Sequence, residues 1–344
     1  MTATLTTRVR SGRLLGVAAV AVSTLAVSCC GSEGAGGSQV VTVYTGRHYG
    51  IEAVFEEFTA ETGIEVRFTT GSDPELRERL IAEGANTPAD LLIAADAANI
   101  DLAAAAGVLA AIESDALAGA VPDELRSADG TWFALSRRLR VIMYSTERVD
   151  TPPADYADLG DPTWKGRLCL RPSTHPYTQS LVAGLINNLG TEAATAIVES
   201  WVANDPLYVN SDTDIVKAIA AGDCDVALAN SYYLARLLGE DPSLAVALQW
   251  PDQAGAGAHL NVSAAGVTAS APNREAAIRL LEWLATSGQK AFSDANNEYP
   301  ADPSVEPASV LVGFGTFTAD MASVRELGRL NPEAMALLSA AGYE

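Results

Sequence analysis

Asp225-Val226-Ala227-Leu228-Ala229-Asn230-Ser231-Tyr232-Tyr233-Leu234-Ala235-Arg236 joins a short apolar run to the start of a helix. The apolar run has the length and the flanking residues of a buried strand, and Ser231 is suited to cap the helix that follows. Two phenols therefore lie where the strand ends. Neighbouring side chains on a helix do not face each other, so both phenols can reach one point only if it lies beyond the helix N-terminus.

A phenolate is a hard anionic oxygen donor, and such a ligand suits a hard, highly charged cation such as Fe³⁺. The Tyr232-Tyr233 pair therefore indicates a metal site, whereas the simpler interpretation is that two tyrosines pack the wall of a cleft. Arg236 lies at i+4 from Tyr232 and at i+3 from Tyr233, which places its guanidinium on the neighbouring face of a helix. A cation at this position favours the deprotonated phenol.

Composition narrows the class of protein. The chain has 344 residues, of which 48% are apolar and 19% charged, which is typical of a globular protein and long enough for two lobes. The net charge of −21 opposes electrostatic binding to nucleic acid. Common hydrolase and phosphate-binding motifs are missing from the sequence, so we expect a protein that is not an enzyme.

The N-terminal residues resemble a bacterial lipoprotein signal peptide, which we assign to residues 1–29. A basic segment precedes an apolar stretch of about fifteen residues, which is too short to span a bilayer as a permanent helix. Small residues precede Cys29, the expected lipid acceptor; Cys30 as acceptor, or a plain secretory signal, is the alternative. Residues 30–39 are then a flexible tether, and we expect an extracytoplasmic protein anchored to the membrane by lipid.

An exported domain folds in an oxidising compartment, where disulfides persist. Cys169 and Cys224 are the two cysteines that remain beyond the signal segment. Two cysteines of this kind most simply pair with each other, and a metal site made of cysteines is the weaker alternative because only two thiols are present.

Between residue 40 and the C-terminus, strand and helix patterns alternate. Strands are expected at residues 40–44, 64–68, 90–95, 139–144, 225–229 and 262–267. Helices are expected at residues 51–62, 74–83, 97–106, 179–189, 214–221 and 274–292. This alternation predicts an α/β fold in which helices cover mixed, mostly parallel sheets.

Two further phenols follow predicted strands. Tyr49 lies in Arg47-His48-Tyr49 after the first strand, and Tyr177 follows the extended run that contains Cys169. Because sheets of this class bind ligands at the carboxyl ends of their strands, three strand ends present phenols to one side. A packing role for either tyrosine is an equal alternative, and His48 and His175 more often support a site than ligate a metal.

Several motifs together resemble those of the ferric-iron solute-binding proteins of ABC importers. The resemblance extends from about Val40 to the C-terminus. It is carried by Asp90-Leu91-Leu92-Ile93-Ala94, Trp132-Phe133-Ala134-Leu135-Ser136, Trp164-Lys165-Gly166-Arg167, Tyr177-Thr178-Gln179-Ser180, Asn230-Ser231-Tyr232-Tyr233 and Asn296-Asn297-Glu298-Tyr299-Pro300.

This resemblance implies a two-lobed periplasmic-binding-protein fold of class II, with a hinge. Residues 40–136 and 262–305 would form one lobe, and residues 137–261 and 306–344 the other. The family implies a monomer that carries a ferric ion or ferric chelate to an ABC permease. The same fold could bind another small solute, such as an oxyanion, a polyamine or a phosphonate.

The resemblance also implies a ligand set. The tyrosine pair of the family corresponds to Tyr232 and Tyr233, and its tyrosine-rich members add phenols that correspond to Tyr49 and Tyr177. The His-Tyr dipeptide of the family corresponds to His48-Tyr49, which makes His48 an additional candidate ligand. Carbonate or water would complete the shell around Fe³⁺, the transported ligand. We also expect two arginines, Arg236 and Arg47, to lie behind the ligands.

Overall fold

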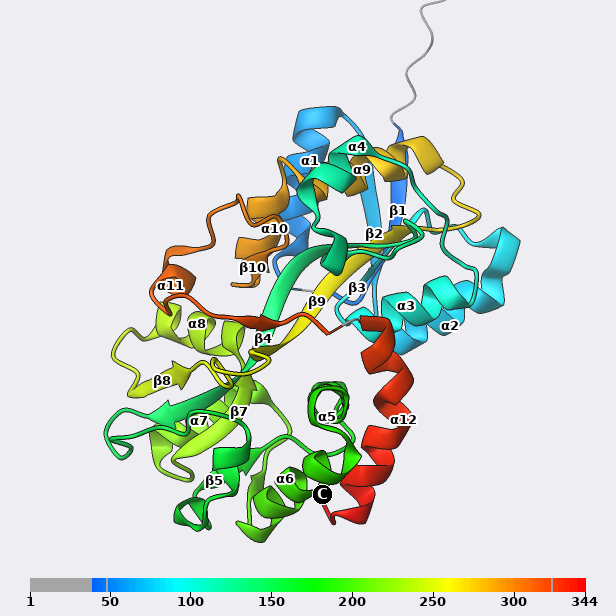
Figure 1. Ribbon diagram of the computed structural model, residues 1–344. Helices are drawn as coiled ribbons and strands as arrows, with labels where there is room; N and C mark the ends of the chain where they lie inside the picture. The colour runs from blue at the N-terminus through cyan, green and yellow to red at the C-terminus, as the bar shows by residue number, and fades with distance from the viewer. Residues whose placement is uncertain (1–38, 48, 323) are drawn as a thin grey trace, which may run out of the picture. The chain divides into compact units, whose positions relative to one another are not determined.

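Two long strands, β4 (Phe133–Ser145) and β9 (Ala258–Val267), lie side by side and antiparallel in the middle of the sheet (Figure 1). The computed structural model describes residues 39–47, 49–322 and 324–344. The predicted signal peptide with Cys29, nearly all of the tether, and His48 lie outside the described residues.

The other strands and the helices alternate along the chain much as the sequence predicts. The strands are β1 (Val40–Thr45), β2 (Glu65–Thr70), β3 (Leu91–Ala94), β5 (Leu168–Leu170), β6 (Leu207–Tyr208), β7 (Val226–Asn230), β8 (Val246–Gln249), β10 (Tyr299–Pro300) and β11 (Ala319–Asp320). The α-helices are α1 (Ile51–Thr62), α2 (Asp73–Glu83), α3 (Ala97–Ala105), α4 (Asp115–Ala120), α5 (Pro176–Leu189), α6 (Thr191–Ala203), α7 (Asp212–Ala221), α8 (Ser231–Glu240), α9 (Arg274–Ala285), α10 (Gln289–Asp294), α11 (Ser309–Val312) and α12 (Val324–Ala340).

The sheet is mixed. Its strand order is β2-β1-β3-β9-β4-β7-β5-β6, with β8, β10 and β11 attached to β4 or β9. Parallel pairs lie toward the two ends, where β1 pairs with β2 and β3, and β5 pairs with β6 and β7. The pairs that involve β4 are antiparallel, as are those that join β3 to β9 and β9 to β4. The predicted α/β class with a mixed sheet is therefore confirmed.

Strand β4 changes partner midway along its length. Up to Leu139 it pairs with β9, and from Arg140 onward it pairs with β7. Strand β4 thus joins the β2-β1-β3-β9 part of the sheet to its β7-β5-β6 part. The division into two lobes at the residues given above stays a prediction.

Strand β7 is buried on both faces, which explains its continuous apolar sequence. Val226 and Leu228 pack into a core that includes Trp201. Ala227 and Ala229 face a separate core on the other side of the sheet. The alternation of side chains between the two cores fixes the register of β7, because a shift of the strand by one residue would move every side chain to the opposite face. Helix α8 therefore starts at a defined point beyond the strand end.

Some predicted boundaries are wrong, and the reasons are local. The long helix expected at residues 274–292 is two helices, because the chain turns at Gly288, where any Cβ would clash with the ring of Trp283. Ser231 does not cap α8; it is the first helical residue, and Asn230 occupies the cap position. The Ser231 hydroxyl has no hydrogen-bond partner within the described part of the chain. Among the described residues, no helix combines the length and apolar character needed to cross a membrane.

Candidate metal centre

Tyr232 and Tyr233 lie in the first turn of α8, directly after β7. Tyr232 is buried and Tyr233 is partly buried, and their ring centroids are 4.1 Å apart at an angle of 31°. The two rings therefore stack against each other, although they are neighbours in sequence. Both residues belong to the first turn of the helix, where the helix dipole favours negative charge.

Tyr177 belongs to the first turn of α5 and reaches the same place from another strand. Its hydroxyl oxygen lies 3.4 Å from that of Tyr232, within hydrogen-bonding distance. The residue before its helix, His175, caps α5: Nδ1 accepts a hydrogen bond from the Tyr177 amide at 3.2 Å. A ring whose Nδ1 accepts this bond carries its proton on Nε2 when neutral, so this tautomer leaves no free nitrogen lone pair for a metal.

Tyr49 comes to this group from the first part of the chain, just before α1. Its side chain is 44% exposed, the most accessible of the four predicted ligands. The guanidinium carbon of Arg236 lies 5.0 Å from the Tyr49 ring and 5.2 Å from the Tyr233 ring. The structure therefore brings Tyr49, Tyr177, Tyr232 and Tyr233 into one neighbourhood with Arg236 between two of the rings.

Burial raises the pKa of the Tyr232 phenol well above its ordinary value, and the neighbouring phenols of Tyr177 and Tyr233 raise it further. Burial and Tyr177 also raise the pKa of Tyr233. Arg138 opposes the shift at Tyr232 but does not outweigh burial. Both phenols are therefore protonated at neutral pH until something displaces the protons, so neighbouring guanidinium groups do not hold them deprotonated in advance.

Arg138 and Arg140 are two members of the site that the sequence analysis did not single out. Arg138 is 1% exposed, and its guanidinium carbon lies 5.3 Å from the Tyr177 ring; that of Arg140 lies 6.0 Å from the same ring. Their spacing in the sequence could have identified them, because residues two apart on a strand point to the same face of the sheet. Two arginines that are buried on one face of a strand destabilise the fold unless they have partners.

The two arginines differ in their partners. Arg140 donates to the carboxylate of Asp212 at 2.5 Å and to the Leu228 carbonyl at 2.9 Å. The partners of Arg138 among the described residues are uncharged: the Ser263 hydroxyl and the Ala95 carbonyl. Arg138 is thus a buried cation beside Tyr177, in a position to stabilise negative charge on the phenols.

Arg47 lies in a buried polar network. It forms an ion pair of 2.9 Å with Glu298 and donates to the Ser136 hydroxyl at 2.9 Å. Its guanidinium also lies 4.2 Å from the centre of the Phe292 ring. Burial would raise the pKa of Glu298, but Arg47 and Arg138 outweigh it and lower that pKa. The Asn296-to-Tyr299 motif therefore supplies a counter-ion to this network.

Cys169 and Cys224 form the predicted disulfide. Cys169 lies in β5 and Cys224 just before β7, two strands that pair in parallel. Both side chains are buried. The bridge joins the strands at the opposite end from Tyr177 and Tyr232, so it fixes the two segments that carry these phenols.

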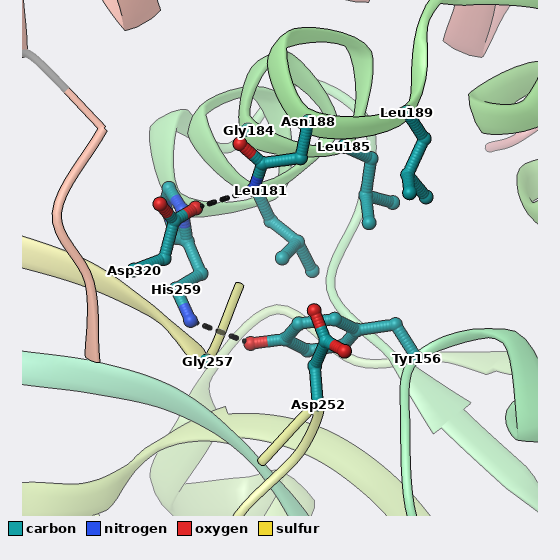
Figure 2. Close-up of a pocket in the computed structure, with 10 residues that line it drawn as sticks. All are labelled: Tyr156, Leu181, Gly184, Leu185, Asn188, Leu189, Asp252, Gly257, His259 and Asp320. Carbon is teal, nitrogen blue, oxygen red and sulfur yellow. Dashed lines mark hydrogen bonds between the residues drawn. The ribbon is translucent and has the colours of Figure 1, made fainter. Parts of the chain in front are cut away.

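Polar side chains that line a separate small pocket (Figure 2) form hydrogen bonds within the protein. The Tyr156 hydroxyl accepts from the His259 amide at 2.9 Å and donates to the Arg140 carbonyl at 2.7 Å. Asp320 accepts from the Asn188 amide group at 2.7 Å. Within the described part of the chain, no group of three or more His, Cys, Asp or Glu side chains is placed to hold a metal.

The family model of bacterial extracellular solute-binding proteins matches residues 53–313 of this chain. Iron uptake protein A1 of Synechocystis sp. is 38% identical over 344 aligned residues, which cover 94% of this chain and 95% of that protein. Membership in a solute-binding family agrees with the prediction that the chain is not an enzyme.

Two solved structures are similar over most of the chain. The Trichodesmium protein FutA (IdiA), solved in complex with iron and citrate ligands, is 40% identical with a TM-score of 0.83, covering 89% of this chain and 100% of that one. Apo FutA2 of Synechocystis is 37% identical with a TM-score of 0.81 and the same two coverages. The predicted periplasmic-binding-protein fold is thus confirmed, as is the resemblance to ferric-iron-binding proteins. This chain belongs to the family of bacterial extracellular solute-binding proteins.

Proposed function

We propose that this chain is an extracytoplasmic lipoprotein that captures Fe³⁺ through tyrosine phenolates and delivers it to the permease of an ABC importer. The ligands that we assign are Tyr49, Tyr177, Tyr232 and Tyr233, with His48 as a further candidate. The observation that carries this assignment is the 3.4 Å separation of the Tyr177 and Tyr232 hydroxyl oxygens. Similarity to iron uptake protein A1 supports the same cargo.

The chemistry of the donor set fits a trivalent ion. Four phenolates carry four negative charges, so with Fe³⁺ they leave a net charge of about −1. The buried guanidinium of Arg138 and the partly buried guanidinium of Arg236 are close enough to offset it. Fe²⁺ has a lower charge and binds hard anionic oxygen less strongly, so reduction offers a route of release.

Water or a small oxyanion such as carbonate is proposed to complete the shell around the ion. Three buried N–H donors have no hydrogen-bond partner among the described residues: Nε of Arg138, Nε of Arg140 and Nδ2 of Asn230. Donors of this kind suit an anion bound beside the metal, because a buried unpaired N–H destabilises the fold. His48 is the alternative that would occupy the same coordination position.

The proposal includes the location of the protein and its partners. Residues 1–29 would direct export, Cys29 would carry the lipid, and residues 30–39 would tether the domain to the membrane surface. The domain would work as a monomer that meets the permease when loaded and would not bind nucleic acid, as its net charge of −21 supports. Its two lobes would close around the ferric ion, because contacts from both lobes exist only in the closed state.

The test is a titration of the metal-free protein with ferric citrate, followed by visible absorption. Phenolate-to-Fe³⁺ charge transfer should give a broad visible band, and the double variant Tyr232→Phe, Tyr233→Phe should lose both the band and tight binding. Tyr208→Phe is the control, because Tyr208 lies in the edge strand β6, which β5 separates from β7. A double variant that still binds Fe³⁺ tightly would place the site elsewhere.

The same titration separates the alternative solute class. A wild-type protein that stays colourless with ferric citrate, yet gains thermal stability with an oxyanion, a polyamine or a phosphonate, would be a receptor for that solute. Binding to the native state raises the unfolding temperature by mass action, so the comparison does not depend on colour.

A further inference from the structure

The first turn of α7 contacts residues next to the segments that carry Tyr177, Tyr232 and Tyr233. Asp212, the first residue of the helix, is 0% exposed, and Thr213 follows it. We propose that this turn positions the phenols of the metal site through Asp212 and Thr213, without touching the metal itself. The inference rests on the proposed function and assigns a role to two residues that sequence patterns identify only as a helix start.

Asp212 joins three elements. Its Oδ2 accepts from Arg140 Nη1 at 2.5 Å and from the Asn230 amide at 3.0 Å. Its Oδ1 lies 3.6 Å from Arg171 Nη1. Arg140 belongs to β4, Asn230 is the last residue of β7, and Arg171 follows β5. A single carboxylate therefore connects three neighbouring strands, close to the strand ends that precede Tyr177 and Tyr232.

Each residue that Asp212 contacts lies close to Tyr177 or Tyr232, in space or along the chain. Asn230 is the cap residue of α8, so the bond to its amide fixes where the helix that carries Tyr232 begins. Arg140 holds its guanidinium 6.0 Å from the Tyr177 ring. Arg171 begins the loop that leads into α5, the helix on which Tyr177 lies. Moving the carboxylate would therefore shift Tyr177 relative to Tyr232.

Thr213 extends the same arrangement to the other two rings. Its hydroxyl accepts from Arg236 Nη2 at 2.7 Å. The Arg236 guanidinium lies 5.0 Å from the Tyr49 ring and 5.2 Å from the Tyr233 ring. The hydrogen bond to Thr213 therefore holds the Arg236 guanidinium in its position between the Tyr49 and Tyr233 rings.

Asp212 acts as a counter-ion in this arrangement. Its Oδ2 accepts two hydrogen bonds, and its Oδ1, which has no hydrogen-bond partner among the described residues, faces the Arg171 guanidinium at 3.6 Å. Groups that orient ligands in this way typically change metal affinity about 10–100-fold when they are removed.

The experiment compares Asp212→Ala, Asp212→Asn and Thr213→Val with wild type in a ferric citrate titration. Readouts are the maximum of the charge-transfer band, the apparent Kd and the free energy of unfolding. Asp225→Asn is the matched control: Asp225 also accepts from two arginines, Arg148 and Arg167, but it precedes β7 and lies at the opposite end from the phenols.

Asp212→Ala should shift the band and weaken Fe³⁺ binding about 10–100-fold. Asp212→Asn retains an oxygen that can accept from the Asn230 amide, so it should restore the band position and part of the affinity. Thr213→Val should weaken binding about tenfold with little loss of stability, which keeps the test informative if the Asp212 variants fold poorly. Asp225→Asn should lower stability and leave both the band and the Kd unchanged.

A charge-transfer band and Kd that are the same in wild type and all position-212 and position-213 variants would overturn this inference alone. An Asp212→Asn variant as defective as Asp212→Ala, or a control variant that shifts the band equally, would also overturn it. A wild-type protein without any band would instead refute the proposed function, and this inference with it.

Discussion

The hydroxyl oxygens of Tyr177 and Tyr232 lie 3.4 Å apart, although 55 positions separate the two residues in sequence. The disulfide between Cys169 and Cys224 spans the same 55 positions. Each tyrosine follows its cysteine by eight residues. Two parallel strands, β5 and β7, thus run from one shared covalent bond to one shared pair of phenols.

We expect the variant Cys169→Ala, Cys224→Ala to fold but to be less stable. In the chain-entropy model, a bridge that closes a loop of this length stabilises the native state by about 4 kcal/mol. Chemical denaturation with and without reductant measures the effect: the reductant should destabilise wild type and leave the variant unchanged. Equal free energies of unfolding for the two proteins would show that the bridge contributes nothing.

Metal binding should release protons. Burial raises the pKa of Tyr232 and of Tyr233, so both phenols are protonated at neutral pH in the empty protein. Loading the full phenol set should release about four protons per Fe³⁺, and the apparent affinity should fall as the pH is lowered. A pH-stat titration corrected for citrate measures the protons.

Tyr232→Phe provides the comparison for this proton count. Because the variant has one phenol fewer, it should release about one proton fewer per bound ion. Loading that releases no protons in wild type would contradict phenolate ligation.

The native state should lose stability in mild acid through His259. Burial, followed by Arg140 and Arg138, lowers the pKa of His259 to about 3, below its ordinary value of 6.5. The neutral ring is favoured in the native state, so its contribution is complete above pH 6.5 and declines as the pH falls toward 3. The slope should be about 1.4 kcal/mol per pH unit. His175 should add a second slope down to about pH 4, because burial lowers its pKa to about 4.

Denaturant titrations at a series of pH values, repeated with His259→Gln, measure this dependence. The variant should have the shallower pH dependence, because the amide does not titrate. The His259 ring contacts the Ser180 hydroxyl at 3.0 Å, so the variant should also be somewhat less stable at neutral pH. Parallel pH profiles for the two proteins would assign the acid sensitivity to other groups.

Arg138→Gln should weaken Fe³⁺ binding by about tenfold. Arg138 lowers the pKa of Tyr232, although burial and the neighbouring phenols raise it, so removing the cation makes deprotonation harder. The control is Arg137→Gln: Arg137 is the preceding residue on β4 and donates to the Pro300 carbonyl at 2.8 Å, away from the phenols. A ferric citrate competition assay measures both variants, and equal losses would show a general effect of charge.

The sequence predicts the elements that bring the phenols together because their signals are local. The apolar run before Asn230 and the glycine at position 63 mark a strand end and a helix end, and both lie where expected. The cysteine pair was also predictable, since only two cysteines follow the signal segment. The rule that ligands bind at the carboxyl ends of strands brought Tyr177 and Tyr232 together, and their hydroxyl oxygens lie 3.4 Å apart.

The parts that were missed depend on contacts between distant segments. Arg138 and Asp212 have no local motif, and their importance comes from neighbours that the fold supplies, such as the Tyr177 ring and the Asn230 amide. The break between α9 and α10 likewise depends on how closely Gly288 approaches Trp283. Ser231 was assigned as a cap because serine is favoured there, but the helix starts one residue earlier than that assignment requires, at Ser231 itself.

The protonated phenols of the empty protein have a consequence for recognition by the importer. A trivalent ion that enters as about four protons leave changes the total charge of the protein by only about one unit. The loaded and empty forms should therefore migrate almost identically in a native gel, against a background charge of −21. Because the two forms have nearly the same net charge, a transporter that distinguishes loaded from empty protein must recognise a difference in conformation.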